Sequence, residues 1–325
     1  MSDMRLGAML SIAVPYPEIA RQARLAEELG FSDLASTQGP ARDALTTFAA
    51  LAAITERVML STTVVPIYAR SPASMAQAAA TIDDISGGRF RLGLGVGHRI
   101  SMEGWHGQSI GQPVAEMREY LGIVRSVLQG REPEPGDRWQ SRFAFVDFEP
   151  RPALPIIQAA LGERMLELAA EVADGVVLWA CPATYVRDTI VPTLTATRAR
   201  AGKSMDNFAI IACVPTAYRG DRDAVLDGVR TELHRYFGLP FYRRMFAAAG
   251  YAADLAAYDA APGLAGQKTA ISTELLNDLC ALGDDEAIGA ALTRYQDAGA
   301  TEVLLSPVPG TTFDDALRAA SALVG

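Results

Sequence analysis

The first candidate for chemistry is a histidine that follows a run of glycines. Gly93, Gly95 and Gly97 alternate with apolar residues and lead directly to His98, one of three histidines in the chain. A strand that ends in glycines lets a flat ligand approach the main chain, because no Cβ stands in the way. An imidazole at the end of such a strand titrates near neutral pH and could exchange a proton with a substrate oxygen. A loop histidine with a packing role is an equally good reading of His98.

The alternating glycines also invite comparison with a dinucleotide-binding fingerprint. In that fingerprint the glycines form the first turn of a strand–helix unit and open the helix directly. Here the next helix that the sequence predicts begins only at Pro113, well beyond Gly97. We therefore disfavour a nucleotide fingerprint at this position.

A second candidate is the turn Ala159-Ala160-Leu161-Gly162, which joins a predicted strand to a helix that begins at Glu163. The first-turn N–H groups and the dipole of that helix suit a phosphate group. An ordinary turn between a strand and a helix explains the same residues equally well. The turn alone does not decide between the two.

Both candidates lie in a chain that alternates strands and helices. The predicted strands are residues 6–11, 32–37, 58–65, 90–96, 155–160, 175–180, 208–214 and 303–306, with a hairpin strand at 143–148. The predicted helices are 17–30, 43–54, 72–86, 113–128, 163–172, one ending at 201, 284–298 and 312–323. Eight such units in one chain favour a (β/α)8 TIM barrel over a doubly wound sheet. We expect a single domain over residues 1–325, with insertions after the fourth and seventh strands, the second being helical over about 221–282.

The composition indicates a globular protein with a large hydrophobic core. Of 325 residues, 50% are hydrophobic, enough for a large core, and the net charge of −9 argues against a nucleic-acid partner. The sequence has no long apolar run and no signal-peptide pattern, and its three cysteines indicate neither disulfides nor a metal site. We expect a cytoplasmic homodimer that acts on a small molecule, without membrane, nucleic acid or metal.

Active sites of such barrels lie at the carboxyl ends of the strands. Of the three histidines, only His98 is predicted there. We expect His106 to pack within the loop that follows, and His234 to be solvated in a charged helical stretch.

Several short motifs together resemble one family, the bacterial-luciferase-like oxidoreductases, in the branch that uses the deazaflavin coenzyme F420. The resemblance covers nearly the whole chain and favours an actinobacterial subgroup. The motifs are Ala26-Glu27-Glu28-Leu29-Gly30-Phe31, Asp43-Ala44-Leu45-Thr46, Ser86-Gly87-Gly88-Arg89-Phe90, Leu92-Gly93-Leu94-Gly95 and Ala173-Asp174-Gly175.

The resemblance implies a set of cofactor contacts. A non-prolyl cis peptide that supports the deazaflavin ring in this family matches Thr62-Thr63 here, and Gly95, Gly97, Trp179 and Gln38 would also line the cofactor. The family's phosphate-binding turn matches the residues Ala159, Ala160, Leu161 and Gly162.

The sequence departs from its relatives after the second strand. Sugar-phosphate and alcohol dehydrogenases of this branch carry an acidic residue and a histidine there, whereas this chain has Gln38 and Gly39. Neither can take a proton, so alcohol oxidation by that route is disfavoured. In the sugar-phosphate enzyme a glutamate follows the fourth-strand glycines. Here that position is His98, which we expect to take the acid/base role.

The expected function is an F420-dependent oxidoreductase that transfers a hydride between C5 of the deazaflavin and a small organic substrate, reducing an activated C=C or C=O bond. The alternatives are an FMN-dependent monooxygenase of the same family and a non-catalytic F420-binding protein. Aromatic residues of the helical insertion suggest an apolar ligand, although packing between helices explains them equally well; they are Tyr236, Phe237, Phe241, Tyr242 and Phe246.

Overall fold

Parallel strands form a closed barrel in the computed structural model, which describes residues 5–308 and 311–321. Among the described residues, eight strands make the barrel, and it closes because the last of them pairs with both the first and the one before it. The eight are β1 (Arg5–Met9), β2 (Asp33–Ser36), β3 (Met59–Thr62), β5 (Phe90–Gly95), β6 (Ile156–Ala159), β7 (Gly175–Trp179), β8 (Ala209–Tyr218) and β10 (Glu302–Pro307). The predicted TIM barrel is confirmed.

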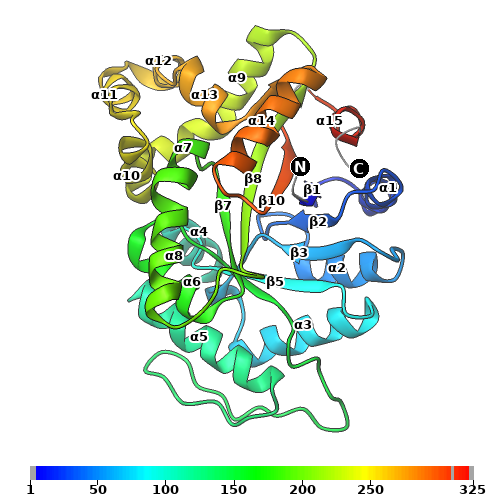
Figure 1. Cartoon of the computed structure of the whole chain (residues 1–325). Coiled ribbons are helices and arrows are strands. Elements are labelled where there is room, and N and C mark those ends of the chain that lie inside the picture. Colours follow the sequence, from blue (N-terminus) through cyan, green and yellow to red (C-terminus); the bar gives the residue numbers. More distant parts are fainter. Residues whose placement is uncertain (1–4, 309–310, 322–325) are drawn as a thin grey trace.

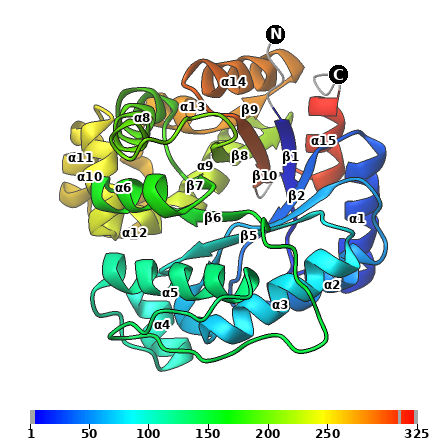
Figure 2. The same cartoon turned by 60° about the horizontal axis from the view of Figure 1, so that its bottom comes forward.

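Helices cover the outside of this barrel (Figures 1 and 2). They are α1 (Tyr16–Glu28), α2 (Ala44–Ala52), α3 (Pro72–Ile85), α5 (Pro113–Leu128), α6 (Glu163–Val172), α7 (Ala183–Tyr185), α8 (Val191–Arg200), α14 (Asp285–Asp297) and α15 (Phe313–Ser321). Side-chain caps fix the starts of several helices. Asp43 accepts a hydrogen bond from the Thr46 N–H at 2.8 Å, and Asp284 accepts one from Ala287.

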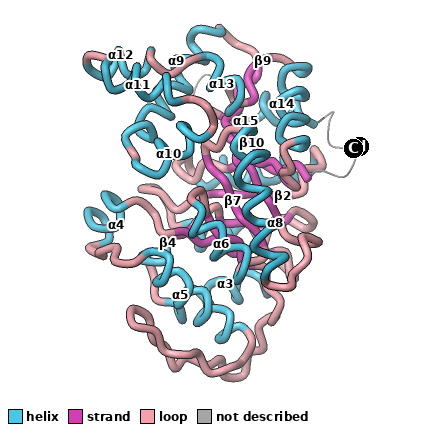
Figure 3. Tube along the Cα trace, turned by 60° about the vertical axis from the view of Figure 1, so that its left-hand side comes forward, coloured by secondary structure: helices cyan, strands magenta, loops and turns pink. Residues whose placement is uncertain are grey.

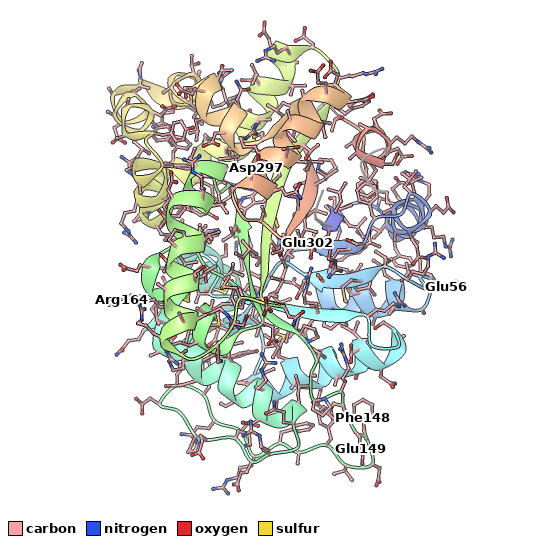
Figure 4. The ribbon with its side chains drawn as sticks, in the orientation of Figure 1. Glu56, Phe148, Glu149, Arg164, Asp297 and Glu302 are labelled. Atoms are coloured by element: carbon pink, nitrogen blue, oxygen red, sulfur yellow. The ribbon has the colours of Figure 1, made fainter. Side chains whose placement is uncertain are left out.

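A buried ion network lies at the amino ends of the strands. Arg91 on β5 is only 5% exposed, and its guanidinium contacts Asp33 at 2.6 Å, Glu302 at 2.8 Å and the Ser61 hydroxyl at 2.9 Å. These partners belong to β2, β10 and β3, and Glu302 lies among the strands in Figure 4. One side chain therefore ties together strands that are far apart in sequence.

A second group of helices follows β8 and lies beside one end of the barrel (Figure 1). It comprises α9 (Arg222–Leu233), the 3-10 turn η3 (His234–Gly238), α10 (Pro240–Ala248), α11 (Ala252–Ala260), α12 (Gly263–Thr269) and α13 (Thr273–Leu279). The short strand β9 (Ala281–Gly283) then pairs with the end of β8. None of the described helices is long and apolar enough to cross a bilayer.

The sequence missed α4 (Arg99–His106), which begins directly after His98. It is short, and Met102 is its one buried side chain, so it lacks the apolar periodicity that marks a helix. The long gap expected between the glycines and the next helix is therefore wrong. The glycines lie within and just beyond β5, a strand of the closed barrel, and this position disfavours a nucleotide fingerprint.

The predicted hairpin strand at 143–148 is also wrong. The loop between α5 and β6 has no strand there, and Phe145 instead packs against Phe143 and Phe148 at ring-centroid distances of 5.1 and 5.2 Å. Figure 4 labels Phe148 and Glu149 on this outer loop. The alternation that predicted a strand reflects aromatic packing among near neighbours.

Candidate active site

The barrel mouth, where the carboxyl ends of the strands meet, has an apolar floor. Met9, Val64, Ala159 and Trp179 follow or end different strands, and all four pack against the same interior cluster of barrel side chains. The cluster comprises Ala35, Ile157, Val177, Ile211, Cys213 and Leu304. The structure thus brings Ala159 and Trp179, two of the predicted cofactor contacts, to one surface.

The non-prolyl cis peptide lies one residue later than expected, at Thr63–Val64. The Thr62–Thr63 pair is wrong for this feature because Thr62 still pairs with Ser36 in the β2–β3 ladder, and the Thr63 N–H donates to the Ser36 carbonyl at 2.8 Å. The break in the strand comes after this bond, before the short strand β4 (Val65–Pro66). Val64, which is not among the predicted cofactor contacts, therefore belongs to the floor.

Thr62 and Thr63 differ in what their hydroxyls do. The Thr62 hydroxyl is buried and joins β3 to β5, accepting from the Gly93 N–H at 2.7 Å and donating to the Gly93 carbonyl at 3.0 Å. The Thr63 hydroxyl is buried without a hydrogen-bond partner in the described part of the chain. Of the two, only Thr63 has a polar atom that a ligand could satisfy.

The chain bulges at Thr63 and Val64, between β3 and β4, and the glycines of β5 make room for this bulge. A Cβ on Gly93 would lie 1.8 Å from the Thr62 carbonyl oxygen, and one on Gly95 would lie 2.5 Å from Val64 Cγ2. Glycine is therefore needed at position 95 because a larger residue would overlap Val64. The sequence had suggested another reason, the close approach of a flat ligand. Gly97 has a φ of +68° and turns the chain into His98.

Replacing Gly95 with alanine is expected to lower the free energy of unfolding by about 1–3 kcal/mol, because the new methyl group overlaps Val64 in a packed barrel. Urea denaturation measures the effect. Gly122→Ala is the matched control: it lies in α5 with open space around it, so it should be neutral or stabilising. Equal effects of the two variants would contradict the packing role assigned to Gly95.

His98 stands at the start of α4, beside the mouth. Its Nδ1 atom is buried and has no hydrogen-bond partner among the described residues. Burial and the nearby Arg235 guanidinium both hold the pKa of His98 below its usual value. A buried imidazole nitrogen that lacks a partner is available to a bound molecule.

Aromatic side chains from the insertion form a roof over His98, made of Tyr236, Phe241 and Tyr242. Their ring centroids lie 6.2, 5.9 and 6.4 Å from that of His98, and the Phe241 ring is parallel to the imidazole within 3°. Tyr236 also lies 6.2 Å from Trp179. In Figure 3, α10, which carries two of these residues, lies above α4 on the same side of the molecule.

The other two aromatic residues of the insertion pack elsewhere. Phe237 and Phe246 are fully buried and stack on each other at 4.7 Å. Packing between helices therefore explains Phe237 and Phe246, whereas Tyr236, Phe241 and Tyr242 lie beside His98.

The turn that the sequence matched to a phosphate site leads into α6. Gly162 is exposed at the helix start, and no side chain caps the first N–H groups. Ala160 is buried, while the Leu161 carbonyl accepts a hydrogen bond from the Tyr185 hydroxyl at 3.0 Å. Arg164 is exposed in the first turn of α6 (Figure 4).

Gln38 serves the protein itself. Its side-chain oxygen accepts from the Ala44 N–H at 2.8 Å, capping α2, and its backbone N–H donates to the Val64 carbonyl at 3.1 Å. Gln38 thus joins the start of α2 to the backbone at Val64.

The other histidines differ from His98. His106 ends α4 and is exposed, where the sequence analysis expected a loop. His234 is half-buried, with Nδ1 2.7 Å from the Thr231 carbonyl.

Comparisons with known proteins agree with this barrel. A candidate coenzyme F420-dependent oxidoreductase of Mycobacterium tuberculosis is 30% identical over 94% of this chain and 95% of its own length. A 5,10-methylenetetrahydromethanopterin reductase of Archaeoglobus fulgidus is 32% identical over 70% of this chain and 68% of its own. The F420-dependent tetrahydromethanopterin reductase of Methanopyrus kandleri has the same fold, with a TM-score of 0.79 at 20% identity and 98% coverage of both chains. The model of the luciferase-like monooxygenase family matches residues 2–302, and the chain belongs to this family.

Proposed function

We propose that the protein is an F420-dependent oxidoreductase that reduces an activated C=C or C=O bond of a small organic substrate. The observation that carries the proposal is His98, whose ring lies beside the aromatic roof and whose buried Nδ1 has no hydrogen-bond partner among the described residues. The relatives named for F420 support the choice of cofactor.

The residues at the mouth fit a deazaflavin. Val64 and Trp179 offer apolar surface to a flat ring, and the Thr63 hydroxyl offers an unused polar atom. The uncapped start of α6, with Arg164 exposed beside it, suits the phosphate of the cofactor tail. Glu163 in the same turn limits the positive potential there.

In this proposal F420 supplies the hydride, at C5 of its ring, and the protein supplies position and protons. His98 exchanges a proton with the substrate beside the roof. Tyr236, Phe241 and Tyr242 hold an apolar substrate and exclude water from it. Gln38 and Gly39 provide no ionisable group for alcohol oxidation at the second strand.

Fluorescence titration of the purified protein with F420, and separately with FMN, tests the cofactor. We expect F420 to bind more tightly than FMN. Replacing Arg164 with alanine is expected to weaken F420 binding about tenfold, because one charged contact to the phosphate is lost. Arg118→Ala, which removes an exposed arginine paired with Glu171, is the control and should leave binding unchanged. Tighter binding of FMN would contradict the proposal and favour a flavin monooxygenase.

A further inference from the structure

The Tyr236 side chain carries a hydroxyl group to which the proposed function gives no role. It is 8% exposed, and its ring lies 6.2 Å from both His98 and Trp179. Its ring is therefore a neighbour of both the residue proposed to move protons and a residue proposed to contact the cofactor. A substrate held between these two groups would meet the tyrosine.

The hydroxyl of Tyr236 is oriented by its neighbour. Arg235 donates a hydrogen bond to the Tyr236 oxygen at 3.4 Å, and its guanidinium lies over the same ring, 5.1 Å from the centroid. Because the oxygen accepts this bond, its own proton remains available to a bound molecule. Arg235 is in turn held by an ion pair with Glu232.

The charged groups that influence Tyr236 are one cation and one carboxylate, which form an ion pair. Burial raises the pKa of Tyr236, although Arg235 and the Trp179 indole oppose the rise, so the phenol keeps its proton at neutral pH and acts as a donor. The Arg235 guanidinium lowers the pKa of Tyr236, and the carboxylate of its partner Glu232 raises it. His98, which faces Tyr236, Phe241, Tyr242 and Arg235, contributes no negative charge.

We propose that the Tyr236 hydroxyl, oriented by Arg235, binds the carbonyl oxygen of a flat α,β-unsaturated carbonyl substrate and stabilises the oxyanion that forms on reduction. This inference rests on the proposed function and names its substrate class. Fixed donors aimed at a developing negative charge are among the strongest contributions to catalysis.

The electrons and protons of the step balance as follows. The β carbon of the substrate accepts a hydride, with both its electrons, from the reduced deazaflavin. The π pair of the C=C bond moves toward the carbonyl, and the resulting enolate oxygen is held by Tyr236. The α carbon then takes a proton from the imidazolium of His98, giving the saturated carbonyl compound and oxidised cofactor.

The shape of the roof supports a flat substrate. The His98 and Phe241 rings are parallel within 3°, and the Tyr242 and Trp179 rings add further aromatic surface. A conjugated carbonyl compound is planar and stacks on such rings. A sugar phosphate, in contrast, would leave most of its hydroxyl groups facing aromatic faces without hydrogen bonds.

Binding of 4-nitrophenolate, a flat oxyanion, to the F420-loaded protein tests the proposal without turnover. Difference absorbance measures the affinity. We expect Tyr236→Phe to weaken binding of the probe about 10- to 100-fold, because a hydrogen bond to a charged oxygen is lost. F420 affinity, measured separately, should be unchanged. The control is Tyr258→Phe, which removes a hydroxyl bonded to the His234 carbonyl inside the insertion, and it should bind the probe as the native protein does.

The same variants are then assayed for reduction of 2-cyclohexen-1-one. We expect Tyr236→Phe to lower kcat and to leave the shape of the pH profile between pH 7 and 9 as it is in the native protein, because burial holds the pKa of the native phenol above its ordinary value of 10. Native affinity for 4-nitrophenolate in Tyr236→Phe, or no binding of the probe to the native protein, would overturn the oxyanion role. A native protein that fails to bind F420 would instead contradict the proposed function.

Discussion

Replacing Arg91 with methionine is expected to lower the free energy of unfolding by about 3–5 kcal/mol, because it leaves two buried carboxylates without their cation. Asp33 and Glu302 are 0% and 1% exposed, and both contact Arg91 directly. Urea denaturation followed by circular dichroism measures the loss. Arg5→Met is the control: its side chain is 44% exposed and 4.0 Å from Asp33, so its removal should cost less than about 1 kcal/mol.

The loss caused by Arg91→Met should grow as pH rises. Burial raises the pKa of Asp33 well above its ordinary value of 3.8, and Arg91 opposes that rise. Without Arg91 the folded pKa moves higher, so the folded state binds more protons than the unfolded state and loses stability as pH increases from about 4 toward 7. The variant should therefore be closer to the native protein at pH 5 than at pH 7. A loss that is the same at both values would contradict this account.

Replacing His98 with alanine is expected to lower the turnover of 2-cyclohexen-1-one with reduced F420 about 100- to 10,000-fold, the usual contribution of a positioned acid or base. F420 affinity and the melting temperature should change little, because the buried Nδ1 of His98 has no hydrogen-bond partner in the described part of the chain. His106→Ala is the matched control, since His106 is exposed at the other end of α4.

The pH profile gives an independent test of His98. Delivery of a proton needs the imidazolium, and burial holds the pKa of His98 below its ordinary value of 6.5. The native kcat should therefore fall as pH rises through a value below 6.5, and His98→Ala should lose that inflection. A rate for His98→Ala that matches the native rate from pH 5 to 8 would exclude the acid role.

Strand and helix order could be predicted from sequence because each element carries local signals. Asp43 and Asp284 stand at the predicted starts of two helices, and each accepts a hydrogen bond from a backbone N–H of the first turn. Apolar periodicity identifies α3 and α5 at their observed starts, Pro72 and Pro113. Eight such units are enough to choose the barrel.

What the sequence missed depends on contacts between distant residues. Arg91 lies in an otherwise apolar strand, and nothing local shows that its partners are Asp33 and Glu302. The cis peptide was predicted one residue too early. The hydrogen bond from the Thr63 N–H to the Ser36 carbonyl, which keeps Thr63 beside β2, can be known only when the pairing of β2 and β3 is known. The roof needed the insertion to fold back over His98, which no spacing in the chain encodes.

The central claim is hydride transfer from a deazaflavin at the His98 site, and its most direct measurement is a single-turnover reaction without oxygen. Native protein loaded with reduced F420 is mixed with 2-cyclohexen-1-one, and formation of oxidised F420 and cyclohexanone is followed. We expect equal amounts of the two products in the native protein and a much slower reaction in His98→Ala. A native protein that leaves reduced F420 unchanged, but consumes reduced FMN together with oxygen, would contradict the account.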